Sequence, residues 1–191
     1  MRHHLHITLL SLLLILPGTA NSNLINGEQV VQMTWDELMP EDYTLSLEDL
    51  FGDFDLNTLD LLDDFSPEAD KMLDNMMSVL ASAPIVPELD QKMVRIPGFV
   101  VPLEYSEDTV SRFFLVPYFG ACIHVPPPPS NQIIDIHFEP GTRVESLYDA
   151  VWISGLLTTE TFSHDMGTAG YRIEAYMIEP YEYGDEDMLV E

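Results

Sequence analysis

The sequence predicts a mainly β protein, in which an acidic, partly helical segment precedes a small five-stranded barrel of the oligonucleotide/oligosaccharide-binding (OB) type. Two observations support this fold class. Five short runs of β-branched and aromatic residues follow one another between residues 91 and 182, which is typical of a small barrel or sandwich. Gly98 and Gly155 lie inside two of these runs, where the strands of a small closed barrel bend sharply. A small β-sandwich is the alternative fold.

The first 20 residues have the features of a cleavable export signal. Arg2 and a group of histidines precede the apolar run Ile7–Ala20, and Gly18 and Ala20 occupy the small-x-small positions of a cleavage site. The run is too short to span a bilayer, and no cysteine directly follows it to carry a lipid. We therefore expect residues 1–20 to be a signal peptide, and the mature chain to be periplasmic, without a lipid anchor or a membrane span.

The charge of the chain excludes some classes of partner. It carries 33 acidic and 7 basic residues, for a formal net charge of -26. Removal of the signal peptide takes away Arg2 and leaves 33 acidic and 6 basic residues, for a charge of -27. Such a charge repels nucleic acid and anionic lipid, whereas it attracts metal ions and basic proteins. A single cysteine, Cys122, excludes an internal disulfide.

Residues 21–90 are expected to form short helices joined by breakers. Thr34 and Glu37 have the spacing of a capping box. Ser66 is a suitable N-cap for a longer helix, with Pro67 at its first position. An apolar stripe at helical spacing follows, which is typical of core packing rather than of a copper-binding surface. The stripe consists of Met72, Leu73, Met76, Met77 and Leu80.

The barrel is expected over residues 91–182, after the proline-broken linker Ser82–Asp90, and residues 183–191 are expected to be an acidic tail. In the last run, alternating apolar and polar residues predict one buried and one exposed face. The five runs are Lys92–Pro102, Arg112–Pro117, Gln132–Phe138, Ala150–Leu157 and Gly170–Pro180.

The first of these runs predicts an irregular strand. Val94 and Ile96 alternate with polar neighbours and are expected to face inward. After Gly98 the inward pattern shifts to Phe99 and Val101. Such a change of phase predicts a bulge or a barrel corner at Gly98.

Four stretches of the barrel region resemble one protein family. They are "IPGFVVPLE", "FFLVPYFGACIHVPPPPSNQI", "VWISGLL" and "AGYRIEAYMIEPYE". Together they cover Met93 to about Glu182, and they are similar to the bacterial exported proteins and lipoproteins of domain of unknown function 3299. The stretch "TWDELMP" resembles the lead-in of the same family. The resemblance implies no established activity, although members accompany transport systems, some of them linked to metal uptake.

A broader likeness exists to exported proteins that are suspected zinc accessories. This chain has one cysteine where those proteins carry a pair. It also lacks the lipid-attachment motif of the lipoprotein members.

Cys122 and His124 form the candidate metal site. They lie two positions apart, so on an extended backbone their side chains point to the same side. A thiolate and an imidazole supply half of a transition-metal site. His137 on a neighbouring strand and His164 in a later loop are the further candidate ligands, and a zinc-like ion is the expected cofactor. The alternative is that Cys122 is a buried structural thiol.

The prolines that follow this motif predict a rigid loop, because four in a row favour polyproline II structure. The loop holds the end of the cysteine-histidine stretch in place. The same region is the candidate surface for a partner, and a component of an envelope transporter is the expected partner. The candidate surface consists of Tyr118, Phe119, Pro126, Pro127, Pro128, Pro129, Asn131 and Gln132.

The motifs favour a binding protein over an enzyme. Cys122 has a histidine nearby to activate it, but the sequence offers no oxyanion hole and no resolving cysteine. We therefore expect an exported accessory protein that binds a zinc-like ion in support of an envelope transport system. The alternative is a non-catalytic interaction module of the cell envelope in which Cys122 is purely structural. The sequence predicts no oligomeric state.

Overall fold

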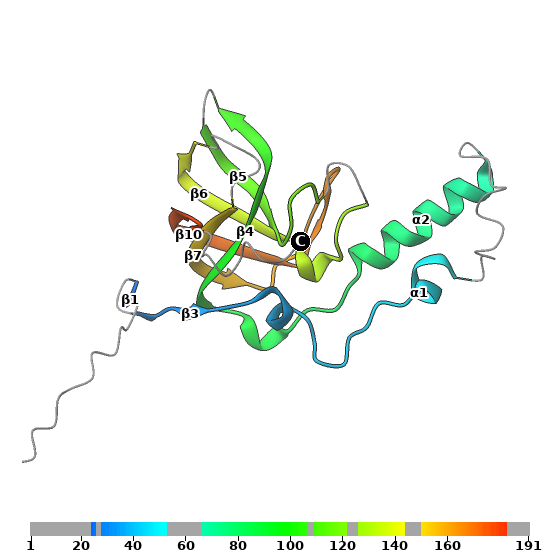
Figure 1. The fold of residues 1–191 in the computed structure, drawn as a ribbon, viewed down its shortest axis with the longest axis horizontal. Helices are drawn as coiled ribbons and strands as arrows, with labels where there is room; N and C mark the ends of the chain where they lie inside the picture. The colour runs from blue at the N-terminus through cyan, green and yellow to red at the C-terminus, as the bar shows by residue number, and fades with distance from the viewer. Residues whose placement is uncertain are drawn as a thin grey trace, which may run out of the picture.

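Five strands of the computed structural model close into a barrel, which Figure 1 shows with its strands side by side. The structure describes residues 24–25, 28–52, 66–106, 109–121, 126–143 and 150–182. The expected signal peptide and acidic tail lie outside the described residues. The barrel strands are β4 (Lys92–Ser106), β5 (Thr109–Val116), β6 (Ile134–Thr142), β7 (Ala150–Thr158) and β10 (Tyr171–Pro180).

The strand order agrees with the predicted OB-like barrel. It runs β4-β5-β6-β10-β7, and β4 also pairs with β7, so the sheet closes on itself. Strands β6 and β10 pair in parallel, whereas the other neighbours in the barrel are antiparallel. The predicted fold class is therefore confirmed, and the alternative of a small β-sandwich is wrong.

Strand β4 closes the barrel because it pairs with two different strands along its length. Its first part, Lys92–Phe99, pairs with β7, and its second part, Phe99–Ser106, pairs with β5. Gly155 allows β7 to lie close to β10, since a Cβ atom there would lie 2.3 Å from the carbonyl oxygen of Glu174. A Cβ atom at Gly98 would lie 2.7 Å from the Leu115 side chain.

The predicted change of phase at Gly98 is wrong. Three side chains of β4 enter the barrel core on one unbroken alternation: Val94, Ile96 and Val100. Phe99 and Val101 face the other side, where Val101 belongs to a second apolar cluster and Phe99 packs against it. The register shifts of β4 lie beyond this point, around Glu104. Because β4 is buried on both faces, the positions of its apolar residues alone do not identify the inner face.

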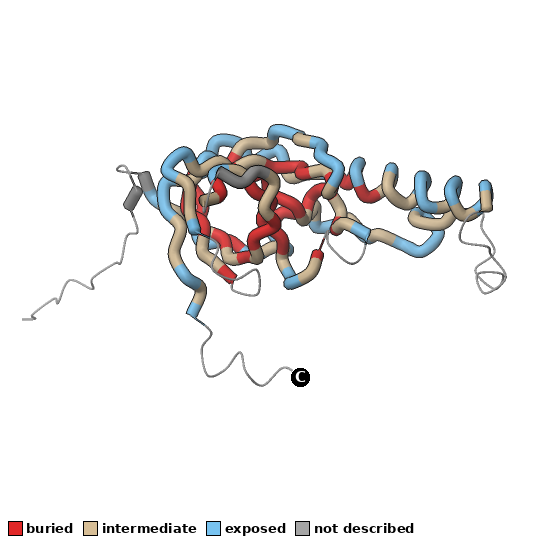
Figure 2. Tube along the Cα trace, turned by 90° about the horizontal axis from the view of Figure 1, so that it is seen from above, coloured by how far each residue is buried: buried red, intermediate tan, exposed pale blue. Residues whose placement is uncertain are grey.

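Two apolar clusters stabilise the barrel. The barrel core consists of Met33, Leu38, Leu89, Val94, Ile96, Val100, Val110, Phe113, Leu115, Ile134, Ile136, Ile153, Leu157, Tyr171 and Ile173. The outer cluster consists of Val101, Phe114, Val116, Ala121, Ile133 and Ala169. It includes part of a hairpin formed by β8 (Phe162–His164) and β9 (Gly167–Ala169). In Figure 2 the buried residues gather around the barrel.

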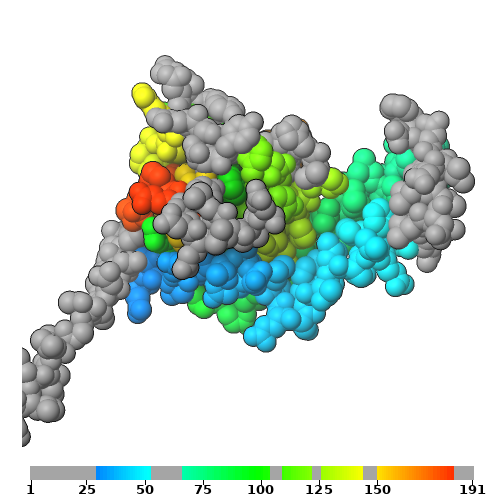
Figure 3. Space-filling model, viewed as in Figure 1, coloured from blue at the N-terminus to red at the C-terminus, as the bar shows by residue number. Residues whose placement is uncertain are grey.

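The lead segment (residues 21–90) supplies core residues to the barrel as well as a helical arm. Met33, Leu38 and Leu89 belong to the barrel core. Figure 3 shows residues 29–40, in blue, lying along the barrel. The elements of the lead segment are β1 (Leu24–Ile25), β2 (Glu28–Gln29), β3 (Val31–Gln32), η1 (Trp35–Leu38), α1 (Leu47–Phe51), α2 (Pro67–Ala81) and η3 (Pro87–Leu89).

The arm consists of α1 and α2, which extend away from the barrel (Figure 1). The Ser66 hydroxyl accepts a hydrogen bond from the Ala69 N–H at 3.1 Å, as expected of an N-cap. The Asn75 amide donates to the Leu50 carbonyl at 2.9 Å and so links the two helices. Of the 15 residues in α2, Leu80 is the buried one. Within the described part of the chain, no helix has the length and apolar character needed to cross a bilayer.

Candidate functional site

The lead segment caps one end of the barrel through helix η1. The Glu37 carboxylate accepts hydrogen bonds from the N–H and the hydroxyl of Thr34 at 2.7 and 3.0 Å, which fixes the start of η1. The Trp35 indole N–H donates to the Pro97 carbonyl of β4 at 2.7 Å. These contacts place Leu38 in the barrel core, where its side chain is fully buried.

The hydroxyl of Tyr171 joins three parts of the chain at this end of the barrel. It accepts a hydrogen bond from the Val86 N–H at 2.7 Å and donates one to the Leu38 carbonyl at 2.8 Å. Burial raises the pKa of the Tyr171 phenol, and the hydrogen bond from Val86 offsets part of that rise. Strand β10 therefore holds η1 and the residues before η3 at a fixed separation.

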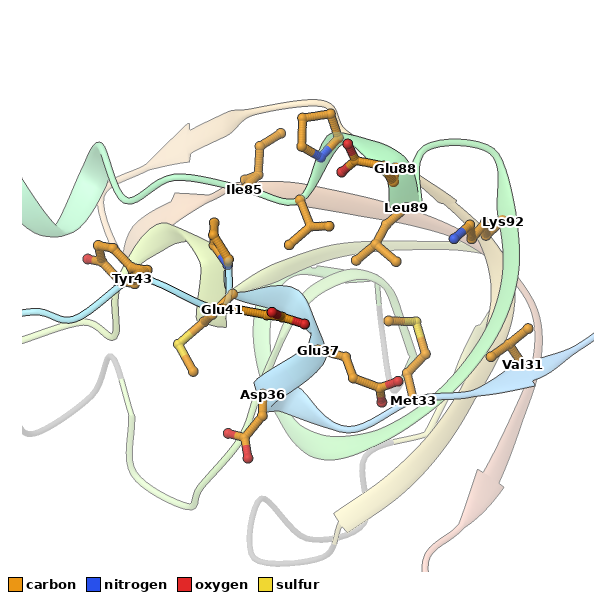
Figure 4. A pocket seen from close by; sticks show the side chains of 14 residues that line it. Val31, Met33, Asp36, Glu37, Glu41, Tyr43, Ile85, Glu88, Leu89 and Lys92 are labelled. Carbon is orange, nitrogen blue, oxygen red and sulfur yellow. The ribbon is translucent and has the colours of Figure 1, made fainter.

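A groove of about 900 Å³ lies between these two segments. Figure 4 shows its apolar floor, to which Met33, Ile85 and Leu89 contribute. The lining residues are Val31, Met33, Asp36, Glu37, Met39, Pro40, Glu41, Tyr43, Ile85, Val86, Pro87, Glu88, Leu89 and Lys92. The groove therefore combines apolar surface with several carboxylates.

The carboxylates at the groove differ in their surroundings. Glu37 is engaged with Thr34, whereas Asp36, Glu41 and Glu88 are exposed. Lys92 is the one basic residue among the lining residues. The groove is therefore suited to a ligand that presents apolar and cationic groups together.

Tyr43 lies at the end of the groove nearest the arm (Figure 4). Burial raises the pKa of its phenol, and the charge of the Asp49 carboxylate raises it further. The Asp49 carboxylate in turn accepts hydrogen bonds from the N–H and the hydroxyl of Ser46, and these hold the pKa of Asp49 below its usual value. Tyr43 is therefore a neutral hydrogen-bonding group at neutral pH.

A second polar assembly, the charged network, lies on the outer face of β5, β6 and β10. Asp135 is fully buried. Its carboxylate accepts hydrogen bonds from Arg112 at two 3.1 Å contacts and from Arg172 at 3.1 Å. His137 contacts the same carboxylate through Nε2 at 3.1 Å, and Glu174 through Nδ1 at 3.3 Å. The Asp135 carboxylate thereby links side chains of β5, β6 and β10.

The hairpin of β8 and β9 packs onto the charged network. The Arg112 guanidinium lies 3.7 Å from the centre of the Phe162 ring. The His164 ring lies edge-on to Phe114, 6.2 Å between ring centres. Glu160, just before the hairpin, forms an ion pair with Arg172. The hairpin thus covers the strand face that OB folds commonly use for ligands.

The predicted metal ligands are only partly within the described residues. Cys122 and His124 lie outside them. His137 directs both ring nitrogens at carboxylates, and His164 accepts a hydrogen bond at Nδ1 from the Met166 N–H at 3.2 Å. Among the residues that the structure describes, no three histidine, cysteine, aspartate or glutamate side chains are grouped to hold a metal ion.

The predicted partner surface divides into exposed and internal residues. Tyr118 and Phe119 are 49% and 43% exposed, and Pro126 is also exposed, whereas Pro128 is buried and Pro127 and Pro129 are intermediate. Asn131 is fully buried.

The amides that follow the prolines bind the lead segment. The Asn131 amide donates to the Pro84 carbonyl at 2.8 Å. The Gln132 amide donates to the Trp35 carbonyl at 3.0 Å. Both residues belong to the short helix η4 (Ser130–Gln132). In this conformation η4 therefore positions the lead segment, and the aromatic pair and Pro126 are the accessible part of the predicted surface.

Sequence reasoning missed the charged network and the groove. The network leaves a signal in the run "QIIDIHF", where Asp135 stands between isoleucines on a strand. An acid in a strand interior requires a basic partner, and few basic residues are available. The groove leaves no comparable signal, because its walls come from residues 31–43 and 85–92, which show no shared pattern.

Comparison with known proteins identifies the family. The family profile described as "Protein of unknown function (DUF3299)" matches residues 35–180. The crystal structure of a DUF3299 family protein from Pseudomonas aeruginosa PAO1 is 35% identical, with a TM-score of 0.61, over 82% of this chain and 99% of that one. An OBody bound to hen egg-white lysozyme is 17% identical, with a TM-score of 0.34, over 52% and 90% of the two chains. A comparison with curated proteins finds no match. The chain belongs to the DUF3299 family, as its motifs predict.

Proposed function

We propose that this chain is a non-catalytic interaction module of the cell envelope, and that its groove binds a partner segment with apolar and basic side chains. The supporting observation is the groove itself. Met33, Ile85 and Leu89 give it an apolar floor, and the exposed carboxylates of Asp36 and Glu88 lie beside that floor. A formal charge of -26 over the whole chain favours a basic partner further.

The two features contribute differently to binding. Burial of one leucine-sized side chain on the floor contributes about 1.5–3 kcal/mol. An exposed ion pair contributes about 0–1 kcal/mol, and salt reduces it. The floor therefore supplies most of the affinity, and the carboxylates select a basic partner over an acidic one and accelerate the encounter.

The first experiment measures binding of a defined probe by calorimetry in about 0.15 M salt, where surface attraction is screened beyond about 8 Å. The probe is the leucine–arginine peptide, acetyl-Thr-Leu-Thr-Arg-Thr-Leu-Thr-amide. Two control peptides replace its leucines with serine or its arginine with glutamate. Saturable binding of the first peptide, and weaker binding of both controls, is the expected result.

Variants of the chain then locate the binding. The pair Asp36→Asn and Glu88→Gln removes two exposed charges from the groove, and should raise Kd by about threefold to tenfold. Val31→Ser, at a lining residue that is 47% exposed, should weaken binding without harm to the core. The matched control is Glu48→Gln with Asp74→Asn, two exposed acids of the arm. Equal effects of the groove pair and the arm pair would show that the peptide binds only through general charge, and the proposal would be wrong.

We infer that the partner belongs to an envelope transport system, as expected for proteins of this resemblance. Envelope extracts from cells that express the full chain, or the chain with Asp36→Asn and Glu88→Gln, would be compared by affinity purification. A membrane transport component that is recovered with the wild-type chain and lost with the variant supports this partner. Recovery of the same component with both chains would place its contact outside the groove.

A second candidate function is zinc binding by Cys122, His124 and His164. The observation that favours it concerns the residues on either side of the cysteine. Ala121 belongs to the outer cluster together with Ala169 of the hairpin. Pro127 lies so close to Gly167 that a Cβ atom at Gly167 would be 3.1 Å from it. One flank of the cysteine-histidine stretch therefore shares the outer cluster with the hairpin that bears His164, and the other flank lies close to that hairpin.

Zinc titration of the chelator-stripped chain tests this candidate. Cys122→Ser, His124→Ala and His164→Ala should each weaken zinc binding by about tenfold or more. His137→Ala should have a smaller effect, because both nitrogens of His137 face carboxylates. Binding should weaken as the pH falls through about 6.5, where free imidazole takes up a proton. Unchanged affinity in all variants would assign the zinc to the acidic surface.

A further inference from the structure

Strand β3 is an edge strand beside the groove. Among the described strands it is the outermost of the six-stranded sheet, and its one neighbour is β4. The Met33 N–H donates to the Arg95 carbonyl of β4 at 2.9 Å. The peptide groups of successive residues in a strand point to opposite sides. The N–H and the carbonyl of Gln32 therefore point away from β4, toward the open edge.

The side chains of the same strand form part of the groove lining. Val31 of β3 and Met33, which directly follows β3, both line it, as expected for residues two positions apart on an extended backbone. Val31 is 47% exposed and Gln32 is also exposed, so the edge is accessible. A strand added beside β3 would direct every second side chain toward the face that Val31 and Met33 occupy.

We propose that the partner segment binds as an additional strand on the open edge of β3, which rests on the function proposed above. Its backbone forms hydrogen bonds with the peptide groups of Gln32. Its groove-facing side chains, two residues apart, are an apolar group over the floor and a lysine or arginine near Asp36 or Glu88. The recognised segment is thus an extended one in which apolar and basic residues alternate with spacers.

This mode of binding makes a prediction that a helical or irregular ligand does not make. An added strand uses the N–H groups of alternate residues toward β3, and leaves the others in water. The leucine–arginine peptide would be prepared in two N-methylated forms, one methylated on the threonine amides and one on the leucine and arginine amides. One form should lose binding by tenfold or more, and the other should bind within about threefold of the parent peptide.

Substitution of Gln32 tests the same edge by a change in the protein rather than in the peptide. Gln32→Pro removes the N–H that points to the open edge, and leaves the Met33 hydrogen bond to β4 intact. It should weaken the peptide by tenfold or more, while the melting temperature stays close to that of wild type. Gln32→Thr keeps the N–H and should bind as wild type does.

The outcomes separate this inference from the proposed function. If the groove variants weaken binding but the two methylated peptides bind equally, the groove binds the peptide without strand addition, and the inference is wrong. If Gln32→Pro, folded as judged by its melting, binds like Gln32→Thr, the inference is wrong as well. If the unmodified peptide does not bind, both the function and the inference are wrong.

Discussion

The hydroxyl of Tyr171 in β10 donates a hydrogen bond to the carbonyl of Leu38, 133 positions earlier in the chain and 2.8 Å away. The same hydroxyl accepts from the Val86 N–H. One side chain thus joins η1, the residues before η3 and the barrel. The position of η1 relative to those residues sets the width of the groove.

Tyr171→Phe should destabilise the chain and weaken peptide binding together. The phenylalanine keeps the ring in the barrel core, but the Val86 N–H and the Leu38 carbonyl lose their partner. A buried polar group left without a partner costs about 1–3 kcal/mol. Urea unfolding followed by Trp35 and Trp152 fluorescence measures the loss. Tyr176→Phe, at a tyrosine that is 49% exposed, is the control and should unfold like wild type.

The stability of the chain should decline at alkaline pH in a way that depends on Tyr171. The pKa of this phenol is raised by burial in the folded chain, whereas the unfolded chain has the ordinary value of about 10. The folded chain therefore keeps a proton that the unfolded chain releases, so rising pH favours unfolding. The stabilisation is fully present below pH of about 10, and is lost as the pH rises from there through the folded pKa. Urea midpoints between pH 8 and 11 should fall more steeply for wild type than for Tyr171→Phe; parallel curves would contradict the assignment.

Asp135→Asn should be among the most destabilising single substitutions in the barrel. It preserves the shape of the side chain but removes the negative charge that Arg112 and Arg172 share. Removal of one partner of a buried ion pair costs about 3–5 kcal/mol, and we expect the lower end because both arginines are partly exposed. The matched control is Glu160→Gln, which removes the exposed partner of Arg172 and should cost less than about 1 kcal/mol. Similar unfolding midpoints for the two variants would show that the network contributes little.

Gly155→Ala and Ser154→Ala, at neighbouring positions in β7, should have opposite consequences. At Gly155 the new methyl group would lie 2.3 Å from the Glu174 carbonyl and 2.5 Å from an Ile173 methyl. The strands must separate to admit it, and such overpacking costs about 1–3 kcal/mol. The Ser154 hydroxyl is buried without a partner among the described residues, so its removal should be neutral or stabilising. Thermal unfolding of both variants gives the comparison, and a Gly155→Ala chain as stable as wild type would contradict the role of the close approach.

The barrel could be predicted from the sequence because local patterns determine it. Short β-branched and aromatic runs specify the strands, and Gly98 and Gly155 lie where neighbouring atoms leave no room for a side chain. The N-caps of η1 and α2 are likewise local, and Thr34 and Ser66 mark them correctly. The phase of β4 could not be predicted, because Phe99 and Val101 are as apolar as the residues that enter the barrel core.

The candidate site was less accessible to prediction because its parts are distant in the sequence. The groove forms only when η1 and η3 lie together at one end of the barrel. No local sequence pattern predicts that Leu38 and Leu89 belong to the same core. The proline run predicts that Asn131 and Gln132, which follow it, belong to a partner surface, yet their amides bind carbonyls of the lead segment. The sequence alone does not distinguish an amide that faces a partner protein from an amide that bonds another segment of the same chain.

Strand β4 has a consequence for the order in which the newly made chain acquires structure. Its first half pairs with β7, so the hydrogen bonds of residues near position 94 can form only after residues near position 155 have been synthesised. The contact of η1 with the end of the barrel forms later still, because Tyr171, which bonds the Leu38 carbonyl, is synthesised after both of these regions. Folds dominated by such separated contacts form in milliseconds to seconds rather than microseconds. For that interval the apolar residues of the cap remain in water, and the dense negative charge around them keeps neighbouring unfolded chains apart.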